Sequence, residues 1–418
     1  MSGDPAPRLW DCPGFGRVWA AATVSGFGSY VTTLAIQVLV VVTLHEGAAG
    51  VGLVSAARWL PYLLFGLVGG VLVERARRRP VLVVTELGLG LLLVAVPVLA
   101  GLHRLSLPVL MALMGVFGLL SLLGDAAAQS FLPRLVPARL LTEANARLGQ
   151  SDAAAQTCGP ALAGLLVSLF SAPVAVLVDA ASYLVSGLLL LRVPVVEPPS
   201  RRALSVRGIR AEAAEGLRWI YRHPMLRSIA LNTHGWFLCN AAVGAVVAPF
   251  ALHTLRLSAF GFGLAMAAAG VGGLAGALVA TRLGVRFGAG RVIISCRGLT
   301  AAAWALAALS APHWSGWLVF GAAQLLVGLS MGAENAHELG YRQAVTPDAL
   351  QGRMNATMRS INRAMIVVGA PLGGLLGDSV GFRAMLWIGA AGFLVVSATL
   401  ALSPFRTARL DGGSASPG

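Results

Sequence analysis

The sequence predicts an all-α multi-pass membrane protein, with twelve transmembrane helices in two pseudo-repeated six-helix bundles. Of its 418 residues, 57% are hydrophobic and only 11% are charged, which lies outside the usual composition of soluble domains. Twelve segments are apolar over about 20 residues, the length of helix that crosses a bilayer core of about 30 Å. Related stretches also recur at an offset of 210 residues, as expected of a duplicated chain.

Each expected helix corresponds to one apolar run, and most of the connections between runs are short. The first run is too long for a secretory signal and lacks a small-residue cleavage site, so it is expected to remain as a membrane anchor. The first six expected spans are residues 18–43, 50–73, 80–101, 107–128, 150–170 and 173–193. The last six are residues 228–252, 259–281, 292–311, 315–341, 350–377 and 383–403.

The distribution of arginine predicts the orientation of these helices. All 31 basic residues are arginine, and the formal net charge is +14. If the N-terminus is cytoplasmic, the segments on that side hold 24 arginines, whereas the outer loops hold only Arg104, Arg256 and Arg383. Short cytoplasmic loops retain basic residues. We therefore expect a protein of the cell membrane with both termini cytoplasmic, and we attribute its charge to topology rather than to a nucleic-acid partner.

The longest connection divides the chain into two bundles. We expect an N-terminal bundle at residues 1–193, a cytoplasmic linker at 194–227, a C-terminal bundle at 228–405 and a cytoplasmic tail at 406–418. The linker contains IRAEAAEGLRWIYRHP, in which Ile209, Leu217, Trp219 and Ile220 form an apolar stripe among charged residues. This pattern predicts an amphipathic helix lying on the inner membrane surface.

Two pairs of stretches carry the internal repeat. VPARLLTEANA at 136–146 aligns with TPDALQGRMNA at 346–356, and CGPALAGLL at 158–166 aligns with GAPLGGLLG at 369–377. In the second pair, Gly159, Pro160 and Pro371 fall inside membrane helices, where proline next to glycine marks a bend or a close approach between helices. Ordinary packing of membrane helices is the alternative interpretation.

The stretch GVLVERARRR at 70–79 resembles the signature of the major facilitator superfamily between its second and third helices. Gly70, Leu72, Arg75, Arg78 and Arg79 match, Glu74 replaces the usual Asp, and Arg77 replaces Gly. The resemblance implies alternating access between two bundles. It also implies a conformational latch, formed by Gly70, Glu74, Arg75, Arg78 and Arg79, in which the arginines contact a neighbouring carboxylate or lipid phosphate. Plain positive-inside charge is the alternative, although it does not require the carboxylate.

Further stretches are similar to bacterial drug/proton antiporter-like exporters. They include VGLVSAARWLPYLLFGLVGG, LVDAASYLVSG and EGLRWIYRHPMLR. The antiporter signature of the fifth helix is only partly present, because GPxxAG stands at 159–164 without the earlier glycines. The resemblance therefore favours efflux more strongly than proton antiport.

Ionisable residues inside membrane spans are functional candidates, because burying them is costly. Glu334 and Glu338 are four residues apart and share one helix face. Arg359 and Arg363 are likewise four apart in the next span. If these two helices form a hairpin centred on Thr346 and Pro347, Glu334 lies opposite Arg359 and Glu338 lies opposite Asn355, while Arg363 lies one turn deeper.

Two interpretations of these charges remain open. In the first, Glu334 or Asp125 exchanges a proton while Arg359 tunes its pKa, and Arg363 meets an anionic substrate group or Asp125 of the other half. In the second, Glu334 and Arg359 form a permanent ion pair that holds two helices together.

Several polar residues are weaker candidates for substrate contact, because hydrogen bonds between helices are at least as common a use of such residues. They are Gln37, Arg58, Asn232 and Glu338. Arg58 and Asp179 occupy similar depths and could form a pair. Glu86 and Asp152 lie near cytoplasmic ends, where solvation at the interface is the simpler explanation.

We expect no enzyme, cofactor or metal site. The four cysteines are far apart and have no histidine at ligand spacing. HELGY at 337–341 has tyrosine where a zinc protease needs its second histidine, and GVGGLA at 270–275 lies within an apolar span, where Gly272 and Gly276 form a small-residue packing pair.

The sequence therefore predicts a proton-coupled exporter of hydrophobic or amphipathic drug-like molecules. Its expected partners are a small-molecule substrate, protons and the lipid bilayer, and a monomer is expected. One alternative is a dedicated exporter of one metabolite, such as a siderophore or a self-made antibiotic. Another is a non-transporting membrane receptor on the same scaffold.

Overall fold

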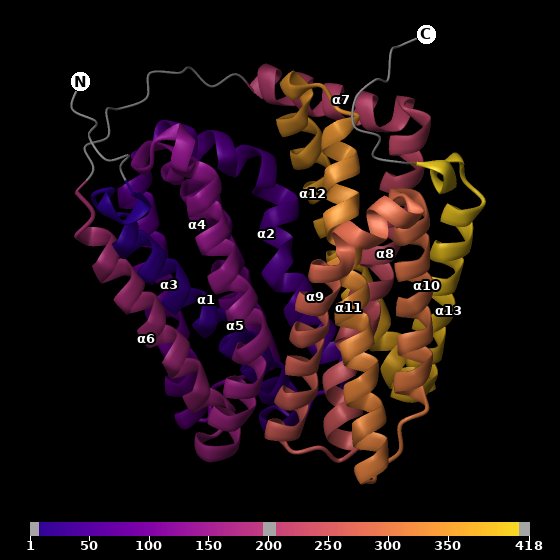
Figure 1. The fold of residues 1–418 in the computed structure, drawn as a ribbon. Helices are drawn as coiled ribbons and strands as arrows, with labels where there is room; N and C mark the ends of the chain where they lie inside the picture. Colours follow the sequence, from indigo (N-terminus) through magenta and orange to yellow (C-terminus); the bar gives the residue numbers. More distant parts are fainter. Residues whose placement is uncertain (1–7, 195–205, 409–418) are drawn as a thin grey trace, which may run out of the picture. The chain divides into compact units, whose positions relative to one another are not determined.

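The computed structural model describes residues 8–194 and 206–408, with the side chains of residues 67–75 and 206–213 not described. The described residues form twelve helices that are long and apolar enough to cross a membrane (Figure 1), which confirms the predicted fold class. These helices group into two compact units. The first unit contains Met1–His45 and Ala57–Ser205, and the second contains Glu46–Ala56 and Val206–Gly418.

The first unit contains the first six membrane helices, one of which begins in the second unit. They are α1 (Phe15–Val38), α2 (Ala48–Arg75), α3 (Arg78–Gly101), α4 (Leu107–Leu135), α5 (Leu141–Phe170) and α6 (Ala172–Leu191). Helix α6 packs against α1 and α3, while α5 packs against α1 and α4 packs against α3.

The second unit contains a short helix followed by the last six membrane helices. They are α7 (Val206–Arg222), α8 (Pro224–Pro249), α9 (Ala259–Phe287), α10 (Ala289–Ala308), α11 (Trp314–Ala344), α12 (Asp348–Val380) and α13 (Phe382–Ala401). Helix α13 packs against α8 and α10, α12 packs against α8, and α11 packs against α9 and α10. The pairs α6–α1, α6–α3 and α5–α1 of the first unit therefore recur as α13–α8, α13–α10 and α12–α8.

Backbone details at corresponding positions confirm the internal repeat. Helix α1 ends in a π-helical turn at Leu39–Thr43, and α8 ends in one at Phe250–Thr254. Each turn is followed by a residue in the left-handed region, His45 or Arg256, and φ is 56° at both. Two chain segments related by an offset of about 211 residues thus adopt the same uncommon conformation.

The membrane helices extend beyond the predicted spans. Helix α5 begins at Leu141 rather than near residue 150, and α9 ends at Phe287 rather than near 281. The added turns are polar or basic, with Glu143 and Arg147 in α5 and Arg282 and Arg286 in α9. Hydropathy detects only the part of a helix that lies in hydrocarbon, so it misses the turns that continue beyond it.

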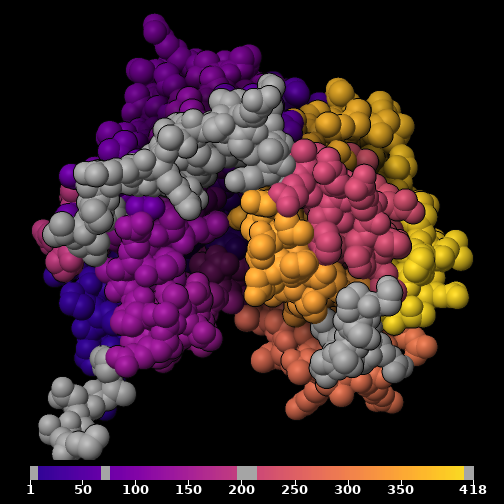
Figure 2. Space-filling view, turned by 90° about the horizontal axis from the view of Figure 1, so that it is seen from above, coloured from indigo at the N-terminus to yellow at the C-terminus, as the bar shows by residue number. Residues whose placement is uncertain are grey.

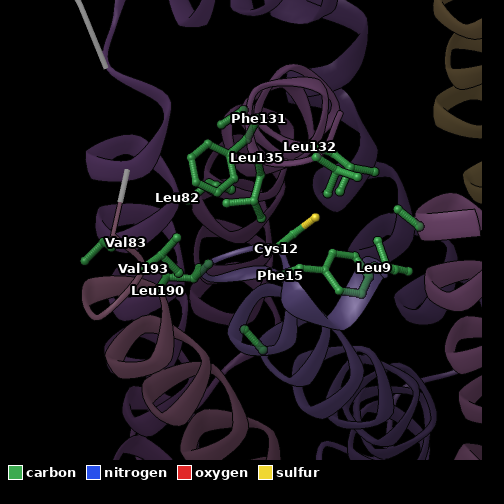
Figure 3. Close-up of a cluster of buried hydrophobic side chains, with 14 residues drawn as sticks. Leu9, Cys12, Phe15, Leu82, Val83, Phe131, Leu132, Leu135, Leu190 and Val193 are labelled. Atoms are coloured by element: carbon green, nitrogen blue, oxygen red, sulfur yellow. The ribbon is translucent and has the colours of Figure 1, made fainter. Parts of the chain in front are cut away.

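A compact apolar cluster fixes one end of the first unit (Figure 3). Phe15, Phe131 and Leu9 are almost fully buried there, next to Cys12. Cys12 therefore acts as a small apolar residue, which is the common role of a free buried cysteine. Gly14 turns the chain into α1 with a φ of 91°, and a Cβ atom at this position would lie 2.8 Å from Val193.

Part of the apolar stripe of helix α7 packs against protein, whereas the prediction placed this amphipathic helix on the inner membrane surface. Ile220 is buried with Met354 and Met358 of α12, and the indole Nε1 of Trp219 donates to Thr346 at 3.4 Å. Leu217 remains exposed. Figure 2 shows α7, in rose, lying against other helices of its own unit. The apolar stripe was identified correctly, but a neighbouring helix covers part of it, and the side chain of Ile209 lies outside the described residues.

Candidate functional site

The centre of the second unit contains an arginine that holds two carboxylates. Arg297 of α10 is completely buried, with a relative exposure of 0%. Its Nε atom lies 2.7 Å from Oε1 of Glu334, and one of its terminal nitrogens lies 3.2 Å from Oε2 of Glu338. The two glutamates are one helical turn apart on α11, so a single guanidinium reaches both.

Helix α8 supplies the remaining hydrogen bonds to Arg297. The guanidinium donates to Oδ1 of Asn232 and, at 2.9 Å, to the hydroxyl of Thr233. Thr233 in turn donates to Oε2 of Glu338 at 3.0 Å. A buried charge is tolerated when its hydrogen-bonding capacity is used in this way. The network therefore joins α8, α10 and α11.

A second arginine balances the charge of the network. Arg342 lies 3.1 Å from Oε1 of Glu338 and also donates to Asn355 of α12 at 3.4 Å. With two arginines and two glutamates, the ionised network is formally neutral. One oxygen of the network differs from the others. Oε2 of Glu334 is buried and has no hydrogen-bond partner among the described residues. A proton can be added at that oxygen without displacing an existing hydrogen bond.

The predicted pair of Glu334 with Arg359 is wrong. Arg359 is exposed on α12, and Arg297 occupies the position next to Glu334. The prediction assumed that helices adjacent in sequence pack side by side, whereas α11 packs against α9 and α10 and α12 packs against α8. The prediction that Glu338 lies opposite Asn355 was nearly correct, because Arg342 forms a hydrogen bond with each of these two residues.

The sequence-based prediction gave Arg297 no role. The distance of each residue from the end of its helix, counted in residues, is one signal that could have pointed to Arg297. Arg297 lies 8 residues into α10, and Glu338 and Glu334 lie 6 and 10 residues from the end of α11. Arg359, however, lies 11 residues into α12. Depth alone therefore did not choose between the two arginines.

The other predicted coupling residues, Asp125 and Arg363, lie on α4 and α12. Asp125 of α4 belongs to the first unit, where Oδ2 accepts a hydrogen bond from the hydroxyl of Tyr62 at 2.6 Å. Arg363 is half-buried on α12. A meeting of Arg363 with Asp125 stays a prediction.

The weaker candidates have defined surroundings. Asn232 uses both ends of its amide, accepting from Arg297 and donating to Thr399 at 3.0 Å, so the role of joining helices is favoured over substrate contact. Arg58 donates to Thr33 at 3.2 Å and lies 4.9 Å from the centre of the Phe117 ring. Gln37 is half-buried on α1.

The predicted contact of Arg58 with Asp179 is not an ion pair in the described chain. Asp179 is fully buried, and its Oδ1 accepts from Ser182 at 2.9 Å, while Arg58 contributes only a longer-range electrostatic interaction. Glu86 also differs from expectation, because its Oε2 atom is buried rather than solvated at an interface. Asp152 is exposed, in agreement with the interfacial interpretation.

The predicted latch is only partly visible. Gly70 and the side chains of Glu74 and Arg75 lie in the stretch whose side chains are not described. Arg78 is buried at the start of α3. Arg79 donates from Nε to the carbonyl of Leu190 at 3.1 Å and from a terminal nitrogen to Leu191, so its partner is the end of α6 rather than a carboxylate. The last carbonyls of a helix lack partners within it and attract cations.

The glycine–proline stretches are sites of close approach. A Cβ atom on Gly159 would lie 2.6 Å from Tyr30 of α1, and one on Gly373 would overlap the carbonyl of Ala242 on α8. Helices α5 and α12 run through Pro160 and Pro371 without ending. Close packing is therefore shown at these places, and a functional bend stays a prediction.

Comparison with known proteins identifies the family. A family model described as a transmembrane secretion effector matches residues 10–415. The chain belongs to this family of major facilitator transporters. The membership agrees with the motif at residues 70–79, with twelve helices and with the duplicated packing.

Several curated relatives resemble this transporter over most of its length. The multidrug efflux pump Tap of Mycolicibacterium fortuitum is 28% identical over 381 residues, covering 87% of this chain and 89% of Tap. The enterobactin exporter EntS of Escherichia coli O1:K1 / APEC is 27% identical over 369 residues, covering 88% of this chain and 83% of EntS. The uncharacterized transporter y4rN of Sinorhizobium fredii is 26% identical, covering 94% of this chain and 96% of y4rN.

Solved structures share the fold of this transporter. The nucleoside transporter NupG aligns with a TM-score of 0.76 at 10% identity, covering 93% of this chain and 98% of NupG. A bacterial homologue of the iron transporter ferroportin in an inward-facing state aligns with a TM-score of 0.72 at 17% identity, covering 94% and 98%. At these identities the comparison shows the fold and leaves the substrate open.

Proposed function

We propose that the protein is a proton-coupled exporter that moves hydrophobic or amphipathic drug-like molecules out of the cytoplasm by alternating access. The similarity to the drug pump Tap and the enterobactin exporter EntS supports efflux. We further propose a monomer in the cell membrane, with both termini cytoplasmic and with substrate, protons and lipid as its partners, and without nucleic acid.

The different surroundings of the two carboxylate oxygens of Glu334 support the proposal of proton coupling. Its Oε1 is bound to Arg297 at 2.7 Å, whereas its buried Oε2 has no hydrogen-bond partner among the described residues. Glu338 differs, because Arg297 and Thr233 occupy its Oε2 and Arg342 occupies its Oε1. Glu334 is therefore the carboxylate of the network with a free site for a proton.

Protonation of Glu334 changes the charge and the contacts of the network together. The neutral carboxyl loses its ionic attraction to Arg297, which keeps Glu338, Asn232 and Thr233 as partners. The interaction between Arg297 of α10 and Glu334 of α11 then weakens. Breaking a buried ion pair typically costs about 3–5 kcal/mol, which is large enough to favour a different arrangement of these helices. In this mechanism Arg297, rather than Arg359, controls the affinity of Glu334 for a proton.

Transport by proteoliposomes with an imposed pH gradient tests the coupling. Glu334→Gln is expected to abolish the acceleration of export by the gradient while downhill movement of a fluorescent drug-like substrate continues. Glu143→Gln, which removes an exposed carboxylate on α5, is the matched control and should keep full coupling. Undiminished gradient-driven export by folded Glu334→Gln would overturn the proposed role.

Glu338→Gln separates coupling from stability. Because both oxygens of Glu338 are bound, this substitution is expected to lower the unfolding temperature more than Glu334→Gln does. The surviving folded protein should retain acceleration by the pH gradient. Loss of coupling in both variants at equal stability would contradict the assignment of the proton to Glu334.

A dedicated exporter of one metabolite is the second candidate, favoured by the similarity to EntS. A panel of cationic, neutral and anionic compounds distinguishes the two functions. Export of one chemical class alone supports the dedicated exporter, and export of several apolar classes supports the drug pump. A non-transporting receptor predicts no export of any compound.

The stretch at residues 70–79 is proposed as a conformational latch. Glu74→Ala, with Arg79 intact, is expected to change the export rate without changing the amount of folded protein. Arg77→Gln, which removes an exposed positive charge from the same stretch, is the control for charge alone. Equal effects of both substitutions would reduce the stretch to a topological anchor.

A further inference from the structure

Four buried oxygen atoms of the first unit have no hydrogen-bond partner among the described residues. They are Oδ2 of Asp179, Oε2 of Glu86, Oγ1 of Thr32 and Oγ of Ser186. The relative exposure is 0% for Asp179 and Thr32 and 1% for Ser186. Buried polar atoms are nearly always paired, so four unpaired oxygens in one bundle require an explanation.

These oxygens form two neighbouring pairs. The Thr32 hydroxyl lies next to Asp179, and the Ser186 hydroxyl lies next to Glu86. The pairs are contributed by α1, α3 and α6, and α6 packs against both α1 and α3. Asp179 and Glu86 are also close enough to interact electrostatically.

The packing of α1 makes room for the Asp179 carboxyl. A Cβ atom on Gly28 would overlap Oδ1 of Asp179 and the hydroxyl of Ser182. Thr32 follows Gly28 by one helical turn and therefore lies on the same face of α1. Oδ1 of Asp179 accepts from Ser182 at 2.9 Å, which leaves Oδ2 for Thr32.

No ion pair to Asp179 or Glu86 is present in the part of the chain that the structure describes. The charged and titratable groups that face them are Arg58 of α2, Asp125 of α4 and Tyr183 of α6. Arg58 is bound to Thr33 and lies against the Phe117 ring, so it reaches Asp179 only at longer range. Asp125 adds further negative charge. Two adjacent buried carboxylates without a paired cation are strongly disfavoured in the ionised form.

We propose that Asp179 and Glu86 form a second proton-binding site, in which each carboxyl holds a proton on its unpaired oxygen. Each proton is taken from water, and no other bond changes. A protonated carboxyl is a donor, so Asp179 donates to Thr32 and Glu86 donates to Ser186. Because the two hydroxyls can also donate to ionised carboxylates, the protonated forms are favoured by burial and by the lack of a paired cation in the described chain rather than by these hydrogen bonds. The site contrasts with the second unit, where Arg297 is paired with two carboxylates.

The binding of protons at this site does not depend on the proposed export function, although the use of those protons in transport does. If transport is proton-coupled, these carboxyls supply protons in addition to the one at Glu334. Direct detection of the protonated groups therefore tests the site separately from any transport assay.

Infrared spectroscopy of the full-length protein in lipid nanodiscs, in H₂O and in D₂O at neutral pH, detects protonated carboxyl groups. We expect a carboxyl C=O absorption that shifts on deuteration and persists in Glu334→Gln. Asp179→Asn and Glu86→Gln are each expected to remove part of it. The double variant, made in the Glu334→Gln background so that Glu334 adds no signal, should lack it entirely. Glu143→Gln, at an exposed carboxylate, should leave it unchanged.

A further variant keeps the test decisive if these substitutions prevent folding. Thr32→Val preserves the shape of the side chain but removes the acceptor for Asp179. The Asp179 absorption should then move to higher frequency, since a carboxyl C=O absorbs at higher frequency when its O–H bond is not hydrogen-bonded.

Three results would overturn the proposal. The first is the absence of a deuterium-sensitive carboxyl absorption in the wild-type protein. The second is its persistence in the double variant or, where that variant does not fold, its insensitivity to Thr32→Val. The third is its loss when sodium replaces choline at constant pH, because the carboxylates would then bind a metal cation in place of protons.

Discussion

The carboxylate of Asp378 on α12 accepts a hydrogen bond at 2.8 Å from the backbone N–H of Ala48, the first residue of α2. Its second oxygen accepts from the N–H of Ala49 at 2.9 Å. The first N–H groups of a helix lack partners within that helix and favour negative charge. Asp378 thus caps α2 from a position 330 residues further along the chain. This contact is consistent with the grouping of residues 46–56 with the second unit.

Asp378→Ala is expected to release the beginning of α2. Loss of a helix cap typically costs about 0.5–2 kcal/mol, so the unfolding temperature should fall. A cysteine placed at Ala49, in a protein whose exposed Cys158 has been changed to serine, should react faster with a thiol reagent. Ser379→Ala is the matched control, because Ser379 bonds only within its own helix. Equal labelling rates in both variants would show that the cap does not hold α2.

The packing of α9 against α11 depends on glycine. A Cβ atom on Gly328 or Gly332 of α11 would overlap the backbone of α9, and one on Gly272 or Gly276 would overlap the backbone of α11. This confirms the expected small-residue packing pair of Gly272 and Gly276. Gly328→Ala should therefore force the two helices apart and lower the unfolding temperature.

Gly321→Ala is the control for this prediction, because Gly321 lies in the same helix with open space around its Cβ position. Alanine is favoured over glycine inside helices by about 0.5–1 kcal/mol, so this change should be neutral or stabilising. Similar destabilisation by both substitutions would argue against close backbone packing.

Arg297→Gln should destabilise the protein because it leaves two buried glutamates without their shared partner. Removal of one member of a buried pair typically costs about 3–5 kcal/mol. Addition of Glu334→Gln should recover part of this loss, since one uncompensated charge is then removed. Denaturation in detergent measures both effects.

Arg353→Gln provides the comparison for Arg297, because Arg353 pairs with Glu215 at the surface. Exposed pairs contribute about 0–1 kcal/mol. A loss for Arg297→Gln no larger than that for Arg353→Gln would contradict the structural importance of the buried network.

Tyr221→Phe is expected to loosen α7 from the second unit. The Tyr221 hydroxyl lies 2.9 Å from Nε2 of His234, whose Nδ1 lies 2.7 Å from Oδ1 of Asn362. Removal of the hydroxyl should cost about 0.5–1.5 kcal/mol and speed amide hydrogen exchange in residues 214–222. Arg218→Gln, at an exposed position of α7, should leave exchange unchanged.

The Tyr221 phenol should titrate at unusually high pH. Burial raises the pKa of Tyr221 above its ordinary value, so the folded state favours the neutral phenol. Its contribution to stability is complete below the ordinary tyrosine pKa of about 10 and is lost as the pH rises through the raised value. The difference in tyrosinate absorbance between wild type and Tyr221→Phe measures this titration, and a midpoint at or below the ordinary value would contradict it.

Much of the fold follows from local patterns in the sequence. Twelve apolar runs predicted twelve spans because a bilayer requires helices of fixed length. The repeat between residues 136–146 and 346–356 predicted the duplicated packing. Helix ends were less accurate, as at Leu141 and Phe287, because the polar turns that extend α5 and α9 carry no hydropathy signal.

Sequence by itself also identified the important charges of the second unit. The spacing of Glu334 and Glu338 placed them on one face of a helix, but Arg297 received no role. Their partners were decided only by tertiary structure. Arg297 and Arg359 occur at similar depths, and the choice between them depends on which helices pack side by side.

The same distinction holds for the first unit. The sequence showed that Glu86 and Asp179 are carboxylates within or near apolar spans, but not that they share one buried site. Their proximity arises because α3 and α6 pack together, and the space at Asp179 arises because Gly28 of α1 faces it. Periodicity and hydropathy report how each helix meets the membrane, whereas the environment of a buried side chain is set by neighbouring helices that the chain reaches only after folding.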